Sequence, residues 1–216
     1  MLLVLLPVSA RGLGRRLDRE QPARMDLYLS AAVSHLLLVA VTLAVDFTGD
    51  RVGIHRLFRL PALASAVSWT LLTFAACAAV WFAMVYETKR HPGRTGQAEL
   101  AMLPRTTRER LAFSGVSLSA GVVEEYLLRG FCLGAVLIAT GSMAVAIVVT
   151  SVSFGLAHLY QGWRSAAAAM LLGAILAVPV AVTGSLAPSV IAHAATDLLS
   201  GFCTLPLLRA WNVPVN

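Results

Sequence analysis

The chain alternates between long apolar runs and short polar connections. Six apolar runs cover residues 27–47, 61–86, 111–139, 143–160, 165–182 and 186–208. A helix needs about 20 apolar residues to cross a bilayer. The runs are rich in Ala and Leu and lack the apolar–polar alternation of strands in a membrane barrel. The pattern predicts an all-α fold, a polytopic membrane helix bundle with about six transmembrane helices.

The third run is longer than one span requires. It covers about 29 residues, whereas a helix rises about 1.5 Å per residue and the hydrocarbon core is about 30 Å thick. We therefore expect residues 111–119 to lie along the membrane interface or to re-enter it, and the span itself to begin near Ala120.

The composition supports a membrane protein. Of the 216 residues, 58% are hydrophobic and 13% are charged, against about 25% charged in soluble domains. Disorder and a disulfide scaffold are excluded, and a water-soluble globule is disfavoured. The net charge is +6, but the basic residues flank the apolar runs and form no single patch, so no nucleic acid partner is expected.

The basic residues also predict the orientation. With the N-terminus inside, 13 Lys and Arg residues fall in inner connections and three fall outside. Positive residues concentrate on the cytoplasmic side. We therefore expect an integral protein of the plasma membrane with both termini in the cytoplasm and the lipid bilayer as its surroundings.

A few ionisable residues lie inside the apolar runs, where a charge costs about 2.5–3.5 kcal/mol on insertion scales. These are Glu124, Glu125, Arg129, His158, His193 and Asp197, together with His35 in the first run. For His35 we expect packing against a neighbouring helix or snorkelling to the interface. The others are candidates for chemistry.

The third run contains two consecutive acids, Glu124 and Glu125, and their positions on the helix predict different roles for them. Glu125 and Arg129 are four residues apart and share a helix face, so they can neutralise each other. Glu124 lies about 100° further round the helix and needs another partner. An acid without a partner on its own helix indicates function, and the alternative is a structural ion-pair cluster.

Two later runs carry histidines. His158 shares a face with Phe154, and His193 shares one with Asp197, which can orient the imidazole or accept its proton. Glu124 with these groups can activate water in either of two ways. Glu124, His158 and His193 can hold a divalent metal such as zinc, or Glu124 can act as a metal-free general base assisted by His158. The chain has no HExxH motif.

The ordered motifs Glu-Glu-x-x-x-Arg, Phe-x-x-x-His and His-x-x-x-Asp, beginning at Glu124, Phe154 and His193, resemble the CPBP intramembrane proteases. This family comprises the type II CAAX prenyl endopeptidases and the bacteriocin-processing proteins, and is also called Abi. The Thr-Gly-Ser-Leu sequence at 183–186 is also typical. The resemblance covers residues 108–208 and implies an all-helical membrane hydrolase that cuts peptide bonds.

The resemblance also implies roles for the residues. Glu124 would activate the attacking water with His158, while His193 and Asp197 would stabilise the oxyanion or help to hold a metal. Glu125, Arg129 and Phe154 would be supporting residues. The family is described both as metalloproteases and as glutamate-type proteases, so zinc stays undecided. Its eukaryotic branch has Asn at the last position. Since an acid donates a hydrogen bond only when protonated, Asp197 favours orienting His193 or binding a metal.

The predicted domain organisation has three parts. Residues 1–107 form an N-terminal region with two transmembrane helices and basic cytoplasmic segments, residues 108–208 form the catalytic core with four, and residues 209–216 form a short tail. The expected substrate is a peptide or a membrane protein, and the oligomeric state is open. The alternatives are a non-enzymatic membrane scaffold or binding protein and a small proton-coupled transporter.

The two histidines differ in predicted depth. His158 falls near the inner end of its run, whereas His193 follows the outer start of the last run by only seven residues. Simple spans separate them by roughly 10 Å along the membrane normal. A broken helix, or a segment at 185–188 that dips into the membrane, would bring them together.

Overall fold

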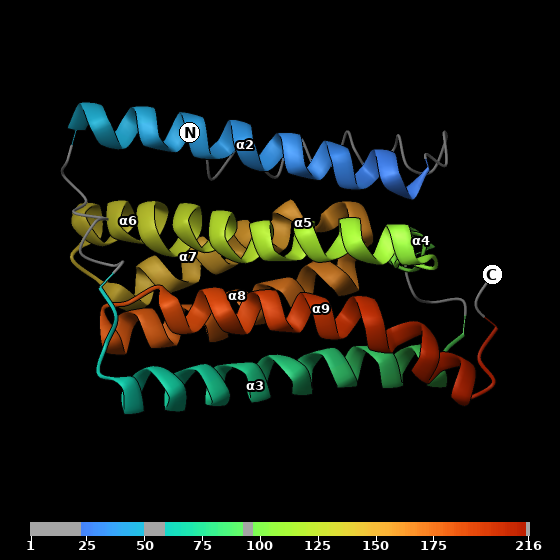
Figure 1. Cartoon of the computed structure of the whole chain (residues 1–216). Coiled ribbons are helices and arrows are strands. Elements are labelled where there is room, and N and C mark those ends of the chain that lie inside the picture. Colours follow the sequence, from blue (N-terminus) through green and yellow to red (C-terminus); the bar gives the residue numbers. More distant parts are fainter. Residues whose placement is uncertain (1–22, 50–58, 93–96, 215–216) are drawn as a thin grey trace.

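A computed structural model describes residues 23–49, 59–92 and 97–214 as a helical bundle (Figure 1). The elements are α2 (Arg24–Gly49), α3 (Leu63–Arg90), α4 (Gln97–Met102), α5 (Thr107–Glu125), the π-helical segment η2 (Tyr126–Cys132), α6 (Leu133–Thr140), α7 (Met143–Ala157), the 3-10 turn η3 (Leu159–Gln161), α8 (Trp163–Thr183) and α9 (Ala187–Ala210). These residues include no strand. The predicted all-α bundle is confirmed.

Each predicted apolar run corresponds to helix in the structure. Four helices are long and apolar enough to cross a membrane, with candidate spans over Arg24–Val41, Leu63–Arg90, Trp163–Thr183 and Ala187–Ala210. The other two predicted spans are α7, which has 15 residues, and the third run, whose helix contains the π-helical segment η2. The count of about six transmembrane helices stays a prediction. The short helix α4 lies in the connection at 87–110 and was not expected from the pattern.

The third run is one unbroken stretch of helix. The pieces α5, η2 and α6, of 19, 7 and 8 residues, follow each other without a gap. A capping box between Thr106 and Glu109 starts the stretch, and Gly141, with a φ of 68°, ends it. The separate interfacial or re-entrant segment expected at 111–119 is therefore wrong. The extra length belongs to the same helix, which begins in a charged sequence.

Small residues bring the helices that carry the motifs close together. A Cβ added to Gly121 on α5 would lie 2.9 Å from the carbonyl oxygen of Val190 on α9. A Cβ added to Gly155 on α7 would lie 2.6 Å from the carbonyl oxygen of Ala166 on α8. Helices in membranes approach closely where the residues are small. Two close pairs, α5 with α9 and α7 with α8, therefore assemble the centre of the bundle.

The outer helices flank this centre on opposite sides (Figure 1). Helix α2 packs mainly against α5, whereas α3 packs against α9 and α8. Many of their large apolar side chains, such as Leu36, Leu37, Leu71 and Leu72, are exposed at the surface of the protein. Exposed apolar side chains on long helices are typical of a surface that faces lipid.

The start of α9 is buried in the protein, which bears on the depth of the histidines. Helix α9 is continuous past His193, so a break at that point is wrong. Ser185 and Leu186 in the preceding turn are only 1% and 2% exposed, and the Ser189 hydroxyl donates to the carbonyl oxygen of Leu176 at 2.7 Å. The turn is thus buried within the bundle, and its dipping into the membrane stays a prediction.

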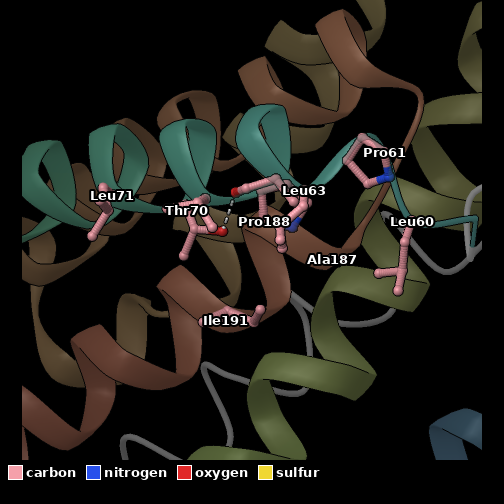
Figure 2. A pocket seen from close by; sticks show the side chains of 10 residues that line it. Leu60, Pro61, Leu63, Thr70, Leu71, Ala187, Pro188 and Ile191 are labelled. Carbon is pink, nitrogen blue, oxygen red and sulfur yellow. Dashed lines mark hydrogen bonds between the residues drawn. The ribbon is translucent and has the colours of Figure 1, made fainter.

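An apolar cavity of about 430 Å³ lies between the beginnings of α3 and α9 (Figure 2). Its lining includes Leu63, Val67, Leu71, Pro188 and Ile191, and contains no ionisable side chain. A site for peptide hydrolysis needs groups that transfer protons. The candidate chemistry therefore lies elsewhere in the bundle.

The close approach of α7 and α8 predicts the effect of one added methyl group. Gly155→Ala should lower the free energy of unfolding by about 1–3 kcal/mol, because the carbonyl oxygen of Ala166 leaves no room for a Cβ. Gly115→Ala is the matched control, since nothing lies within 4 Å of the added Cβ, and it should not destabilise. Unfolding in detergent micelles measures both. Equal midpoints for Gly155→Ala and the wild type would contradict the packing described.

Candidate active site

A buried ion pair occupies the middle of the bundle, where α5 passes into η2. Arg129 Nη1 donates to Glu125 Oε1 at 2.9 Å, and the two side chains are 1% and 0% exposed. The other terminal nitrogen, Nη2, donates to the carbonyl oxygen of Gly173 on α8 at 3.0 Å. The predicted pairing of Glu125 with Arg129 is confirmed, and it also ties η2 to α8.

Glu125 also holds the ring of His193. His193 Nδ1 lies 2.8 Å from Glu125 Oε1. The ionised carboxylate can only accept, so Nδ1 is the donor. The other ring nitrogen, Nε2, faces Glu124 Oε2 at 3.8 Å and Asp197 Oδ2 at 3.9 Å. The sequence favoured Asp197 as the group that orients His193. The closer partner is Glu125, and Asp197 stands at ion-pair distance.

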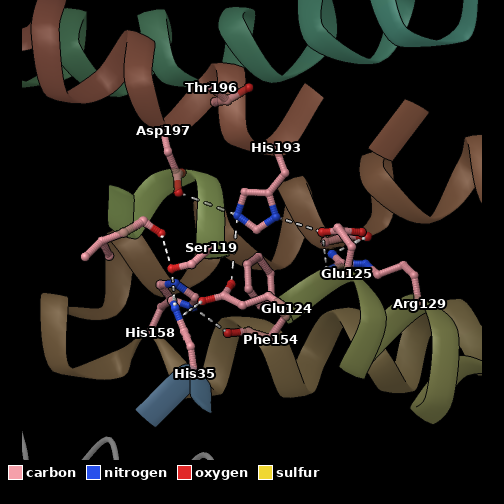
Figure 3. A network of polar contacts seen from close by, with 12 residues as sticks. His35, Ser119, Glu124, Glu125, Arg129, Phe154, His158, His193, Thr196 and Asp197 are labelled. Carbon is pink, nitrogen blue, oxygen red and sulfur yellow. Dashed lines mark hydrogen bonds and ion pairs between the residues drawn. The ribbon is translucent and has the colours of Figure 1, made fainter. Parts of the chain in front are cut away.

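Glu124 points away from Arg129, as its place on the helix predicted, and shares only His193 with Glu125 among the partners described here (Figure 3). Its two oxygens face two different imidazoles. Oε1 lies 3.6 Å from His35 Nε2, and Oε2 lies 3.8 Å from His193 Nε2. The Glu124 side chain is 24% exposed, whereas that of Glu125 is fully buried. Of the two consecutive acids, only Glu124 is therefore accessible to a water molecule or a substrate.

His158 is fixed by the end of its own helix. It follows the last residue of α7, and its Nδ1 donates to the carbonyl oxygen of Phe154 at 2.9 Å. A carbonyl oxygen only accepts, so Nε2 of the neutral ring carries the lone pair. The Phe154 ring lies edge-to-face with His158, with centroids 4.5 Å apart, and with His193 at 5.9 Å. Phe154 thus bridges the two histidines.

The structure brings the predicted site residues together. Glu124, Glu125 and Arg129 come from the α5–η2 helix, Phe154 and His158 from the end of α7, and His193 and Asp197 from the first turns of α9. Arg129 lies over the Phe154 ring, 4.8 Å from its centroid. Their roles in catalysis stay predictions.

The sequence indicated no site role for His35, yet the structure places it beside Glu124. Its Nδ1 lies 2.9 Å from Ser119 Oγ on α5, and the residue is 8% exposed. Packing against a neighbouring helix, one of the two expectations, is therefore observed. A signal was available in the spacing, since Tyr28 and His35 are seven residues apart and share one helix face. Both are buried, whereas Leu36 and Leu37 are exposed.

The predicted metal ligands do not form a metal-binding group as they stand. In the part of the chain that the structure describes, no three His, Cys, Asp or Glu side chains are placed to hold a metal ion. Glu124 Oε2 and His193 Nε2 lie 3.8 Å apart, and His158 follows the end of another helix, α7. The zinc expectation stays a prediction.

The buried ion pair predicts that replacing Arg129 destabilises the protein far more than replacing the partly exposed Arg164. Arg129→Met should destabilise the protein by about 3–5 kcal/mol, because it leaves the Glu125 charge buried without a cation. Arg164→Met is the matched control, since Arg164 pairs with Glu87 at 3.4 Å with side chains 28% and 43% exposed, where a pair contributes about 0–1 kcal/mol. Unfolding in detergent measures both, and similar losses for the two variants would refute the assignment.

Comparison with known proteins agrees with this geometry. Residues 107–199 match the family described as type II CAAX prenyl endopeptidase Rce1-like. No curated protein and no solved structure matches the chain. Together with the four apolar helices, the match indicates an integral membrane protein and supports an intramembrane endopeptidase of the CAAX type in general. The match to residues 107–199 agrees with the resemblance to the type II CAAX prenyl endopeptidases that the three motifs predicted.

Proposed function

We propose that this protein hydrolyses a peptide bond of a membrane-associated substrate, with Glu124 as the general base. The observation that carries the proposal is the contrast between the two adjacent acids. Glu125 is fully buried and bound to Arg129, whereas Glu124 is 24% exposed and faces two imidazoles. A general base must reach both a water molecule and the reacting carbonyl group. Glu124 meets this requirement and Glu125 does not.

The proposed reaction moves one proton through Glu124. Glu124 takes a proton from water as the water oxygen forms its bond to the carbonyl carbon of the substrate. When the tetrahedral intermediate breaks, the carbon–nitrogen bond cleaves and the same proton passes to the leaving nitrogen. His158, whose Nε2 carries the lone pair in the neutral ring, assists in the first step. Glu124 thus acts as the general base in the first step and as the general acid in the second.

His193 is proposed to stabilise the oxyanion. Glu125 fixes its Nδ1, so the ring presents Nε2 to the space next to Glu124. A protonated Nε2 is a donor in surroundings from which water is largely excluded, where donors stabilise developing charge most effectively. Asp197, 3.9 Å from that nitrogen, favours the positive charge that the ring then carries. Asp197 thus acts through His193 instead of donating to the oxyanion itself.

The charge distribution supports the proposed location, with both termini in the cytoplasm and the protein in the plasma membrane. Lys89 at the end of α3 lies 4.7 Å from the centroid of the Trp211 ring, just past the end of α9, and Glu87 pairs with Arg164 at the start of α8. Arg24 at the start of α2 lies 3.8 Å from Glu109. These contacts gather cationic residues from several helices, which is the pattern of a cytoplasmic side.

Replacing Glu124 tests the proposal directly. Glu124→Gln should lower the cleavage rate by about 100-fold or more, because the amide cannot accept the water proton, while the unfolding midpoint stays close to that of the wild type. The purified protein would be assayed in liposomes with a farnesylated peptide ending in a CAAX sequence and with a panel of unprenylated membrane peptides. Glu87→Gln, at an exposed acid on α3, is the matched control.

Two outcomes would overturn this assignment. Cleavage by Glu124→Gln at the wild-type rate would remove Glu124 from the mechanism. If no peptide were cut and Glu124→Gln instead changed proton flux across the liposome membrane, the transporter alternative would replace the peptidase.

Chelation separates the glutamate-type reaction from metal catalysis. Because the donor atoms in the described residues do not converge on a metal position, we propose the metal-free reaction. Cleavage should therefore persist in a strong chelator, and elemental analysis of the active protein should find less than one zinc per chain. Loss of cleavage in the chelator with recovery on adding zinc would show that the metal reaction operates.

A further inference from the structure

We propose that His35 is a positioning residue of the peptidase centre, supplied by a helix outside the matched family domain. The inference rests on the proposed function of Glu124 as the general base. His35 lies on α2 (Arg24–Gly49), whereas the family match begins at residue 107. Its ring would hold Oε1 of Glu124 in place, so that Oε2 is directed to the reacting groups.

The orientation of the His35 ring follows from a chain of hydrogen bonds. The Ser119 hydroxyl donates to the carbonyl oxygen of Val116 at 2.8 Å. Its oxygen is therefore an acceptor for His35 Nδ1, which lies 2.9 Å away. With Nδ1 engaged as the donor, the ring orientation is fixed and Nε2 points to Glu124 Oε1 at 3.6 Å. Nε2 donates to this oxygen in the imidazolium form of the ring, in which both nitrogens carry a proton. Both ring nitrogens thus face polar groups of α5.

This arrangement repeats the one on the other side of Glu124. His193 is locked through Nδ1 by Glu125 and presents Nε2 to Glu124 Oε2, just as His35 is locked by Ser119 and presents Nε2 to Oε1. Glu124 is therefore held between two imidazoles, each with a fixed ring. Residues that orient a reacting group in this way typically change activity 10- to 100-fold when they are lost.

The surroundings of Oε1 explain why a partner is needed there. His35 is buried, whereas the adjacent Leu36 and Leu37 are exposed at the surface of the protein. A carboxylate next to apolar helices is stabilised in its ionised form by a cationic or hydrogen-donating neighbour. Without the imidazole, the nearest partner of Oε1 is lost and the carboxylate is free to rotate away from the His193 side.

Contacts away from the site hold α2 in register with α5. The Tyr28 hydroxyl donates to the carbonyl oxygen of Met102 at 2.7 Å, and its ring lies edge-to-face with that of Phe113. Tyr28 is two helical turns before His35, on the same face. The docking of α2 and the contact with Glu124 can therefore be changed separately.

Kinetics of matched variants test the role of His35. His35→Ala should lower kcat by about 10- to 100-fold with little change in KM, because the imidazole acts on Glu124 and not on the substrate. Ser119→Ala should lower kcat in the same sense, and Ser119→Thr, which keeps the hydroxyl, should restore it. Ser34→Ala is the adjacent control, since that side chain is exposed and bonds only to the Ser30 carbonyl oxygen. Tyr28→Phe controls for weaker docking of α2.

A spectroscopic measurement tests the contact without relying on activity. In protein labelled with ¹⁵N-histidine, the Nε2 signal that disappears in His35→Ala should shift in Glu124→Gln and stay in place in Glu87→Gln. If the wild type cleaves no peptide, the proposed function fails, but this shift still decides whether His35 and Glu124 are coupled.

The positioning role is overturned by any of three results. The first is a wild-type kcat for His35→Ala. The second is an equal loss of kcat in Tyr28→Phe, which would show that α2 docking alone matters. The third is a His35 Nε2 signal that does not respond to Glu124→Gln.

Discussion

The buried ion pair between Glu125 and Arg129 is the interaction on which the rest of the centre depends. Two charges in an apolar bundle persist only when each compensates the other, and further hydrogen bonds offset part of the cost of burying them. Here Arg129 reaches across to the Gly173 carbonyl oxygen on α8, and the same Glu125 oxygen accepts from His193 on α9. The ion pair therefore links the α5–η2 helix to α8 through Arg129 and to α9 through Glu125, and the helices cannot shift against each other without exposing a charge to apolar surroundings.

This constraint also sets the position of Glu124, the proposed general base. Consecutive residues of a helix point about 100° apart, so fixing Glu125 inside the bundle turns Glu124 toward α2 and α9. Glu124 then has the exposure that a base requires, next to a neighbour that has none. The histidines are fixed in the same manner. Each donates through Nδ1 to an acceptor, and those of His35 and His193 present Nε2 to Glu124.

The centre is not contained in the matched domain alone. Residues 107–199 supply the paired acids, Phe154, two histidines and Asp197, whereas α2 supplies His35 from the preceding region. Helix α2 packs mainly against α5 and faces outward with large apolar side chains. Helix α2 has few partners other than α5, yet it completes the surroundings of Glu124. The N-terminal half of the chain therefore contributes a contact to the proposed centre.

The sequence by itself determined the helices and their approximate ends, because apolar periodicity and run length are local properties of the chain. It also determined the pairing of Glu125 with Arg129, since residues four apart on a helix are neighbours. Only the tertiary structure decided that His193 is held by Glu125, 68 residues earlier in the chain, and not by the local candidate Asp197. It also decided that His35, which contacts Ser119 across 84 residues of sequence, reaches Glu124. The spacing of residues along one helix does not encode which helices pack together, and the close approach of α5 to α9 and of α2 to α5 is what brings these distant groups into contact.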